Sequence, residues 1–296
     1  MKNSEDIAWS IGTTAFAALL EELYTTPKPG LVDLYSCGAH QDMNDQTFEK
    51  SAAAIRPFLT EMAAQGYLSG GTPEELFLAV RKTGLAAEQA MYEATDGVNT
   101  HKGLIFSLGI FCAAAGRCIR EGTEINYENL VSTEKQMTYR ILLEELEQIK
   151  KRQAVSHGEI LLKQYNTWGI RGEAIRGYPS VTGLAVPVMQ KGTQLGKDWN
   201  LVKLQTLLVL MSSVEDSNIL ARHNPAVLSQ VHSEAAAFLK AGGAYAAAAV
   251  EQLRMMDRDY IRRNISAGGC ADLLAITIFF ELLMKKDGLS SHGMKR

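Results

Sequence analysis

The sequence predicts an all-α fold. Runs of alternating apolar and polar residues, rich in β-branched side chains as strands require, are nearly absent. Alanine, leucine, glutamate and lysine instead fill long segments that end at glycine or proline. Several segments begin with the residue types that cap helix N-termini. We therefore expect a single globular bundle of about ten helices, formed by one domain over residues 1–296.

The first expected helix carries an apolar residue at every fourth position, which places these residues on one face: Ile7, Ile11, Ala15, Leu19 and Leu23. It ends before the two prolines of TTPKPG. Further helices are expected at about residues 45–50, 72–95, 100–120, 127–152, 157–165, 198–220, 225–240 and 244–263.

Capping signals justify several of these starts. Thr72 is followed by proline and two glutamates, Ser156 precedes Glu159 by three residues, and Asn224 precedes a proline. Gly242-Gly243 ends the helix that Asn224 opens. Three segments are expected to be loops because they concentrate glycine, proline and polar side chains: residues 25–45, 166–182 and 264–270. Loops longer than helical bundles need are often functional.

Composition excludes several classes of protein. The formal charge of -3 offers no basic field for nucleic acid. The start, MKNSEDIAWS, lacks the apolar stretch of a signal peptide, so we expect a cytoplasmic protein. The longest apolar stretch, residues 104–119, contains Arg117 and is shorter than the roughly 20 residues of a membrane span, which indicates a core helix. Four cysteines without metal-type spacing indicate free thiols: Cys37, Cys112, Cys118 and Cys270.

The first candidate motif is TPKPGLVDLYSCGAHQDM, residues 26–43. Prolines on either side of Lys28 stiffen the backbone, which suits a phosphate contact. Asp33, His40 and Asp42 follow, and carboxylate oxygens beside a triphosphate are what Mg²⁺ requires. An ordinary proline-bounded turn with solvated charges remains the alternative.

The second motif is GVNTHKGLIFSLG, residues 97–109. Asn99 or Thr100 can cap an apolar helix whose first turn carries His101 and Lys102. A lysine there opposes the helix dipole by about 0.3–1 kcal/mol unless an anion compensates it. The motif therefore predicts an anion site, although it lacks the spacing of a phosphate-binding P-loop.

The third motif is GIRGEAIRGYPS, residues 169–180. Its Arg171, Glu173 and Arg176 lie among three glycines, with Trp168 and Tyr178 nearby. A guanidinium can bind phosphate bidentately, and an aromatic ring can stack on adenine. Solvated loop charges are the alternative.

The fourth motif is VEDSNILARHN, residues 214–224. Glu215, Asp216 and Asn218 place oxygen ligands within one turn, and Arg222 follows one turn beyond Asn218 on the same face. This set suits magnesium or a general base held by a neighbour. A polar helix end is the alternative.

The fifth motif is RRNISAGGCADLLA, residues 262–275. Gly268-Gly269 opens an apolar helix, and helix capping accounts for Asp272 in its first turn. Asn264, after two arginines, can reach a phosphate. The remaining histidines show no metal-ligand spacing and are interpreted as structural or solvated: His157, His223, His232 and His292.

Taken together and in this order, TPKPGLVD, GAHQDM, GVNTHKG, RGEA with GYP, EDSN and NISAGGCADLLA resemble the triphosphoribosyl-dephospho-CoA synthase family over residues 20–280. Two segments depart from that pattern: Ser217 stands where the family has threonine, and Ala267 and Cys270 stand where it has proline and serine. The resemblance implies an all-helical enzyme that transfers the triphosphoribosyl unit of ATP to 3'-dephospho-CoA, releases adenine and makes the prosthetic-group precursor of citrate lyase. The sequence leaves open whether a malonate decarboxylase takes the product instead. A later acyl-carrier-protein transferase is expected to take the product.

Such a glycosyl transfer requires a carboxylate base, and we predict Asp216 in that role, Asp33 as a competing candidate and Asn218 as an orienting residue. Asp42 and Asp216 are predicted to hold Mg²⁺ with the triphosphate, and no redox cofactor is needed. Substrate or phosphate contacts are predicted at Lys28, His40, Asn99, His101, Lys102, Arg171, Glu173, Arg222, Asn264, Gly268 and Gly269. An ATP or nucleoside N-glycosidase and a non-catalytic nucleotide-binding protein are the alternatives, and oligomerisation stays open.

Overall fold

Over residues 3–286, which the computed structural model describes, the chain forms thirteen α-helices, a π-helix (η1), a 3₁₀ helix (η2) and no strand. The expected all-α class is therefore confirmed, with slightly more helices than ten. The helices are α1 Ser4–Leu23, α2 Asp45–Leu68, α3 Pro73–Ala94, α4 Lys102–Arg120, α5 Tyr127–Lys151, α6 His157–Tyr165, α7 Gly169–Arg176, η1 Ser180–Ala185, α8 Val186–Gln194, α9 Trp199–Met211, α10 Ser217–Arg222, α11 Pro225–Lys240, η2 Gly243–Tyr245, α12 Ala249–Arg262 and α13 Gly268–Met284.

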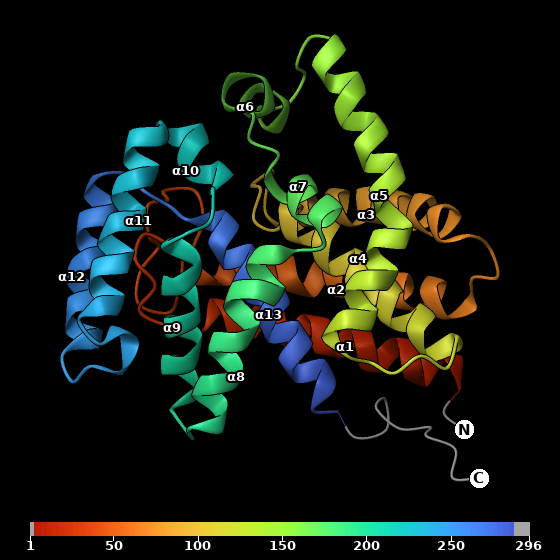
Figure 1. Cartoon of the computed structure of the whole chain (residues 1–296), viewed down its shortest axis with the longest axis horizontal. Helices are drawn as coiled ribbons and strands as arrows, with labels where there is room; N and C mark the ends of the chain where they lie inside the picture. The colour runs from red at the N-terminus through yellow and green to blue at the C-terminus, as the bar shows by residue number, and fades with distance from the viewer. Residues whose placement is uncertain (1–2, 287–296) are drawn as a thin grey trace.

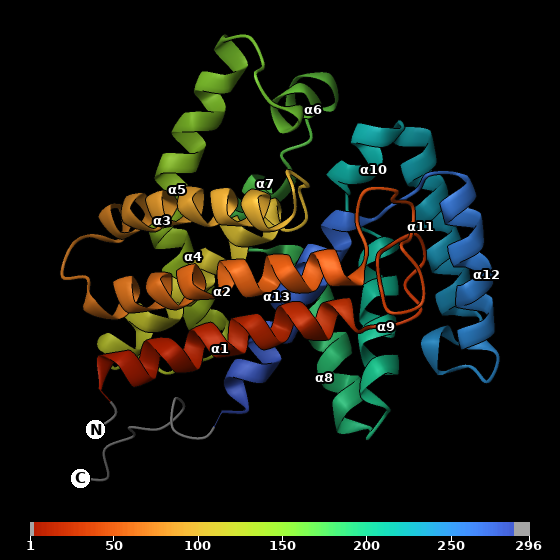
Figure 2. The same ribbon diagram turned by 180° about the vertical axis from the view of Figure 1, so that it is seen from behind.

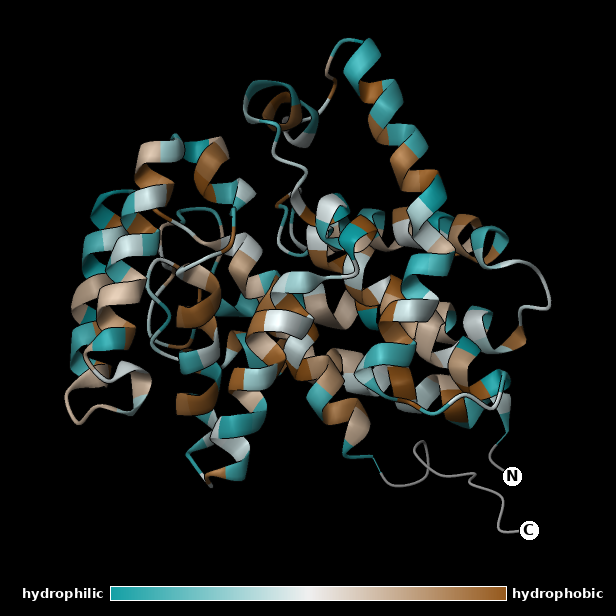
Figure 3. Ribbon diagram, in the orientation of Figure 1, coloured by the Kyte–Doolittle hydropathy of each residue, from teal (hydrophilic) through white to brown (hydrophobic). Residues whose placement is uncertain are grey.

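The core lies where α4 and α13 meet the first three helices. Helix α2 packs against α1, α3 and α4, and α13 packs against α1, α4 and α9 (Figures 1 and 2). Brown, hydrophobic residues gather along the helices at the centre of Figure 3. Within residues 3–286, α4 is the single helix long and apolar enough to span a membrane, but 72% of its most apolar window is buried in this protein. It is the core helix that the sequence predicts.

A second group of helices, α8, α9, α11 and α12, stands beside this core (Figures 1 and 2). The loop between α1 and α2 lies against that group. The Asn200 side chain on α9 accepts a hydrogen bond from the Thr26 N–H at 3.0 Å, and Asp257 on α12 accepts one from the Gly30 N–H at 2.9 Å. The predicted loop at residues 25–45 is thus tied to the C-terminal helices.

Two expected boundaries are right, because the helices at 157–165 and 225–240 begin after the predicted caps, Ser156 and Asn224. The expected helix at 198–220 is wrong: α9 ends at Met211 and α10 starts at Ser217. Asp216 breaks it by capping α10, since its side chain accepts hydrogen bonds from two backbone N–H groups of that helix. The segment predicted at 45–50 extends to Leu68, and that at 244–263 begins only at Ala249.

The expected loop at residues 166–182 is mostly helical. It contains α7, closed by Gly177 in the left-handed conformation (φ 79°), and the start of η1. The many glycines of this segment suggested a loop, yet three of them lie at the ends or inside a short helix. The loop at 264–270 is shortened because α13 begins at Gly268.

Candidate active site

Two adjoining cavities lie at the N-terminal end of α13. The larger, about 650 Å³, is bounded by α7, the start of η1, the turn before α10 and the N-terminal turns of α13. The smaller, about 130 Å³, lies between the loop at residues 25–45, the start of α4 and the start of α13. Gly103, Asn218 and Asp272 line both cavities. The two spaces therefore meet at these three residues.

The charges of the two linings differ. Three cations and two carboxylates line the smaller cavity: Lys28, Lys102, Arg222, Glu22 and Asp272. One cation and four carboxylates line the larger: Arg176, Glu173, Glu215, Asp216 and Asp272. The smaller cavity thus favours anions, whereas the larger favours neutral or positively charged groups.

Lys28 is the most deeply buried cation of the smaller cavity. Its side chain is 1% exposed, forms an ion pair with Glu22 on α1, and donates a hydrogen bond to the Glu22 carbonyl oxygen at 2.8 Å. A buried charge needs such a partner to avoid a large desolvation penalty. The pair fixes the ammonium group at the cavity wall.

His40 and Arg222 are held together on the same wall. Arg222 Nη2 lies 3.2 Å from His40 Nδ1, and Arg222 Nη1 donates to the Ala39 carbonyl oxygen at 2.8 Å. Burial, followed by the neighbouring Arg222 charge, lowers the pKa of His40 to about 4. At neutral pH His40 is therefore an uncharged donor or acceptor beside a fixed guanidinium.

The start of α4 forms the opposite wall. Asn99 accepts a hydrogen bond from the Lys102 N–H at 3.2 Å, but neither Asn99 nor Thr100 is the cap residue, which is His101. Lys102 Nζ lies 2.9 Å from Glu88 on α3. A carboxylate of the protein therefore already balances the charge that the sequence assigned to a bound anion.

His101 is a buried residue of the smaller cavity. Its Nδ1 lies 2.6 Å from the Ser51 hydroxyl, and its ring packs edge-on against Phe48 with the centroids 5.0 Å apart. Burial, together with the nearby Lys28 charge, lowers the pKa of His101 to about 3. His101 is thus neutral and contributes shape and polarity rather than charge.

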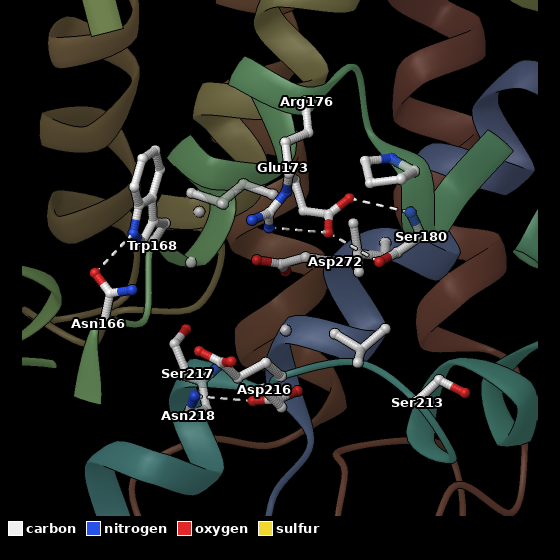
Figure 4. A pocket seen from close by; sticks show the side chains of 18 residues that line it. Asn166, Trp168, Glu173, Arg176, Ser180, Ser213, Asp216, Ser217, Asn218 and Asp272 are labelled. Carbon is white, nitrogen blue, oxygen red and sulfur yellow. Dashed lines mark hydrogen bonds and ion pairs between the residues drawn. The ribbon is translucent and has the colours of Figure 1, made fainter. Parts of the chain in front are cut away.

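Glu173 and its neighbours form the upper part of the larger cavity in Figure 4. Glu173 accepts hydrogen bonds from the Ser180 N–H at 3.2 Å and the Ser180 hydroxyl at 2.8 Å, and Arg176 lies 3.9 Å away. Trp168, just before α7, donates from its indole N–H to Asn166 at 3.2 Å. An aromatic ring beside polar groups suits a nucleobase.

Asp216 joins two helix N-termini. One of its oxygens accepts from the N–H groups of Asn218 (2.8 Å) and Ile219 (3.3 Å), and the other accepts from the Cys270 N–H at 2.8 Å. Burial raises the pKa of Asp216, whereas these backbone hydrogen bonds lower it. Asp216 lines the cavity as predicted, yet both of its oxygens already have partners in the protein.

The close approach of α13 to α10 depends on its two glycines. A Cβ at Gly268 would lie 2.7 Å from the Asn218 amide nitrogen, and a Cβ at Gly269 would lie 3.0 Å from an Asp216 oxygen. At Cys270, where the family pattern has serine, the contact with Asp216 described above comes from the backbone, and the thiol is buried. That contact does not require the family's hydroxyl.

The fifteen predicted site residues do not all line a cavity. Those lining at least one cavity are Lys28, His40, Asn99, His101, Lys102, Glu173, Asp216, Asn218, Arg222, Gly268 and Gly269. Those lining neither are Asp33, Asp42, Arg171 and Asn264. Asn264 still touches the site indirectly, because it accepts a hydrogen bond from Arg222 at 3.1 Å.

Asp33 has a structural environment instead of a catalytic one. Its buried carboxylate accepts hydrogen bonds from the backbone N–H groups of Lys28 (2.7 Å), Tyr35 (2.6 Å) and Ser36 (2.9 Å). It therefore shapes the loop that presents Lys28. Asp42 is 63% exposed and lies 3.8 Å from His40.

The expected metal pair does not form one site, because Asp42 lies outside both cavities and the oxygens of Asp216 bind backbone N–H groups. Within the described part of the chain, no group of three histidine, cysteine, aspartate or glutamate residues is arranged to hold a metal ion. These residues do not fit a resident metal site.

Two expectations about aromatic and acidic residues are corrected. Tyr178 is fully buried and packs against Phe111 with ring centroids 4.8 Å apart, so it belongs to the core and cannot stack on a nucleobase. Asp272 is not a helix cap: it is the fifth residue of α13, where it lines both cavities. An acidic residue near the start of a mostly apolar, buried helix was the signal in the sequence that pointed to it.

The other histidines have ordinary contacts where they are described. His223 and His232 contact the carbonyl oxygens of Asn264 (2.9 Å) and Val214 (2.8 Å). His292 lies outside the described residues.

Comparisons with known proteins agree with the motifs. A family model described as ATP:dephospho-CoA triphosphoribosyl transferase matches residues 8–291. A 2-(5''-triphosphoribosyl)-3'-dephosphocoenzyme-A synthase from Klebsiella pneumoniae is 40% identical over 263 residues, which cover 88% of this chain and 87% of the relative. Proteins described as probable synthases of the same name, from Citrobacter koseri and Vibrio cholerae, are each 38% identical and cover 94% and 92% of this chain and 92% and 88% of their own.

No solved structure matches the fold. The match of the family model nevertheless covers almost the whole chain, and the relatives extend over most of it at 38–40% identity. The chain therefore belongs to the ATP:dephospho-CoA triphosphoribosyl transferase family, which confirms the resemblance found in its motifs.

Proposed function

We propose that the two cavities divide the substrates of the family's reaction between them. As a member of this family, the chain is a transferase that moves the triphosphoribosyl group of ATP to dephospho-CoA and makes the prosthetic-group precursor of citrate lyase. The smaller, cation-lined cavity takes the triphosphate. The larger takes the adenine and the acceptor ribose, and the reacting ribose carbon lies where the cavities meet.

The observation that carries this assignment is the opposite charge of two cavities that share Gly103, Asn218 and Asp272. At about 130 Å³ the smaller is below the roughly 300–1,000 Å³ typical of whole-ligand pockets, whereas the larger, at about 650 Å³, falls in that range. A triphosphate in the first and a nucleoside in the second fit both the charge and the sizes.

The acidic lining of the larger cavity also suits the chemistry. Breaking the bond between ribose C1' and adenine develops positive charge on the sugar, as in other glycosyl transfers. Carboxylates that already face this position stabilise the charge without reorganising. The triphosphate, held by the cations of the smaller cavity, fixes the sugar where the two cavities meet.

Magnesium enters this proposal as part of the substrate. The chain offers no resident metal site among its described residues, but Mg²⁺ is commonly bound through substrate phosphates and one or two carboxylates. MgATP is therefore the proposed donor, and no redox cofactor takes part. The product then passes, in the cytoplasm, to an acyl-carrier-protein transferase.

The experiment is to incubate the purified protein with ATP, Mg²⁺ and 3'-dephospho-CoA and to follow adenine and the triphosphoribosylated product by mass spectrometry. The proposal expects both, in equal amounts. Adenine released equally well without dephospho-CoA would instead identify an N-glycosidase. Binding of both substrates without any adenine would indicate a non-catalytic nucleotide-binding protein.

A further inference from the structure

We infer that Asp272, rather than Asp216, is the general base that removes the proton of the attacking hydroxyl. The inference rests on the proposed function, because it takes the acceptor ribose to lie in the larger cavity. Asp272 projects from α13 into the centre of the site, between Glu173 and Asp216 in the view of Figure 4.

Its position is the first argument. Asp272 is the one carboxylate that lines both cavities, so it lies where the triphosphate end and the acceptor end must meet. Its carboxylate also lies directly over the start of α4: a Cβ at Gly103 would be 2.6 Å from Asp272 Oδ2. The absence of a side chain at Gly103 leaves room for the carboxylate at the junction.

The lack of a protein partner is the second argument. No hydrogen bond or ion pair links Asp272 to any residue between 3 and 286, and no dashed line reaches it in Figure 4. A base must have a free oxygen within reach of the proton it accepts. Asp272 meets this requirement.

The other carboxylates of the site lack a free oxygen or lie away from the junction of the two cavities. Glu22 is paired with Lys28, Glu173 accepts two hydrogen bonds from Ser180, and both oxygens of Asp216 accept backbone N–H groups. Glu215 lines the larger cavity only and is exposed. Asp272 is thus the partly buried carboxylate that remains available.

Its surroundings agree with this role. Burial, followed by repulsion from the carboxylates of Glu22 and Asp216, raises the pKa of Asp272 well above its usual value. A carboxylate with a raised pKa holds a proton more strongly and is a more effective base near neutral pH. The same surroundings destabilise the ionised form in the folded protein.

The proposed transfer step accounts for every bond and for the proton. The 2'-hydroxyl oxygen of dephospho-CoA forms a bond to C1' of the ATP ribose, and the bond from C1' to the adenine nitrogen breaks with its electron pair leaving on adenine. The hydroxyl proton moves to the Asp272 carboxylate. It then passes to the departing adenine, directly or through water, and Asp272 is again ionised.

The test compares Asp272→Asn with Asp96→Asn, the same change at an exposed carboxylate that lines neither cavity. Single-turnover formation of the product should fall about 100- to 10,000-fold for Asp272→Asn and stay within about threefold of wild type for Asp96→Asn. The dissociation constants of MgATP and dephospho-CoA should stay within about threefold of wild type. Thermal stability of Asp272→Asn should equal or exceed that of wild type, because an unpartnered buried charge has been removed.

A second variant separates a missing base from a disturbed structure. Asp272→Ala leaves space for a small carboxylate, so added formate should restore part of the turnover while formamide, which is similar in size but not basic, should not. Turnover of Asp272→Asn within about tenfold of wild type, or no rescue by formate in a folded Asp272→Ala protein, would overturn the inference. If the wild-type protein itself forms no product, the proposed function has failed instead.

Discussion

The two cavities differ most in how far their charged groups are already paired. In the smaller cavity the cations have protein partners: Lys28 binds Glu22, Lys102 binds Glu88, and Arg222 contacts His40 and Asn264. In the larger cavity Asp272 has no partner among the described residues, and Glu215 is exposed. Paired cations make a rigid anion site, whereas an unpaired carboxylate is free to exchange a proton.

This difference separates binding from chemistry. Pairing reduces the net charge of the smaller cavity but holds each cation in one place, which suits a group that is bound and not altered. Burial raises the pKa of both Asp216 and Asp272, and repulsion from the Glu22 and Asp216 carboxylates raises the pKa of Asp272 further. Such shifted pKa values are typical of sites where a side chain exchanges a proton with a substrate.

The largest expected effect comes from breaking the buried pair on the binding side. Lys28→Met should lower the free energy of unfolding by about 3–5 kcal/mol, because Glu22 is left buried without its partner. Adding Glu22→Gln should recover much of that stability without restoring turnover. Denaturant unfolding and product formation are measured on both proteins. Full recovery of turnover in the double variant would show that Lys28 serves only the fold.

Arg222→Gln tests the smaller cavity as the triphosphate site. Loss of a charged hydrogen-bond donor should weaken inhibition by inorganic triphosphate about ten- to a hundredfold, and inhibition by adenosine should change less than about threefold. The inhibition constants of both compounds against MgATP provide the measurement. Equal weakening of the two inhibitors would mean that one cavity holds the whole nucleotide.

Lowering the pH tests whether the histidines of the smaller cavity are neutral. The pKa of His101 is about 3 in the folded protein and about 6.5 when unfolded, so the unfolded state binds the extra proton first as the pH falls. Stability should therefore fall with pH from about 6.5 towards 3, and this residue alone should cost about 2 kcal/mol between pH 7 and 5. His101→Gln should show that much less pH dependence in denaturant unfolding. An unchanged pH dependence would mean that His101 is charged in the folded state.

Trp168→Leu is the matched change in the larger cavity and should have the smallest effect. Loss of a stacking surface, worth about 1–3 kcal/mol per base, should weaken inhibition by adenosine about tenfold and leave inhibition by inorganic triphosphate unchanged. The same two inhibition constants are measured as for Arg222→Gln. If inhibition by triphosphate weakened and inhibition by adenosine did not, the larger cavity would bind the triphosphate and the smaller cavity the nucleoside.

Much of the fold follows from local rules. The caps at Thr72, Ser156 and Asn224 start helices where the sequence predicts them, because a capping side chain acts on backbone groups only two or three residues away. The apolar stretch at residues 104–119 forms the core helix α4 for a similar reason. The break between α9 and α10 was missed, since an apolar run followed by a polar end resembles one continuous helix.

The candidate site was predicted less evenly. The motifs containing Lys28, Lys102 and Arg222 do meet at one cavity, although no local rule relates them. The sequence could not show that the second oxygen of Asp216 is occupied by the Cys270 N–H, because that contact depends on how two distant segments of the chain pack. Nor could it show that Asp272 is free.

By itself the sequence determined the helical class, most helix starts and the family, because caps, periodicity and motif residues are properties of neighbouring positions. The tertiary structure alone decided which carboxylates are paired and which one faces both cavities. The physical reason is that pairing and burial depend on distances between segments far apart in the chain, as between Asp216 and the Cys270 N–H at 2.8 Å. The sequence shows that a carboxylate is present. Only its neighbours in the folded protein decide whether its oxygens are free to accept a proton.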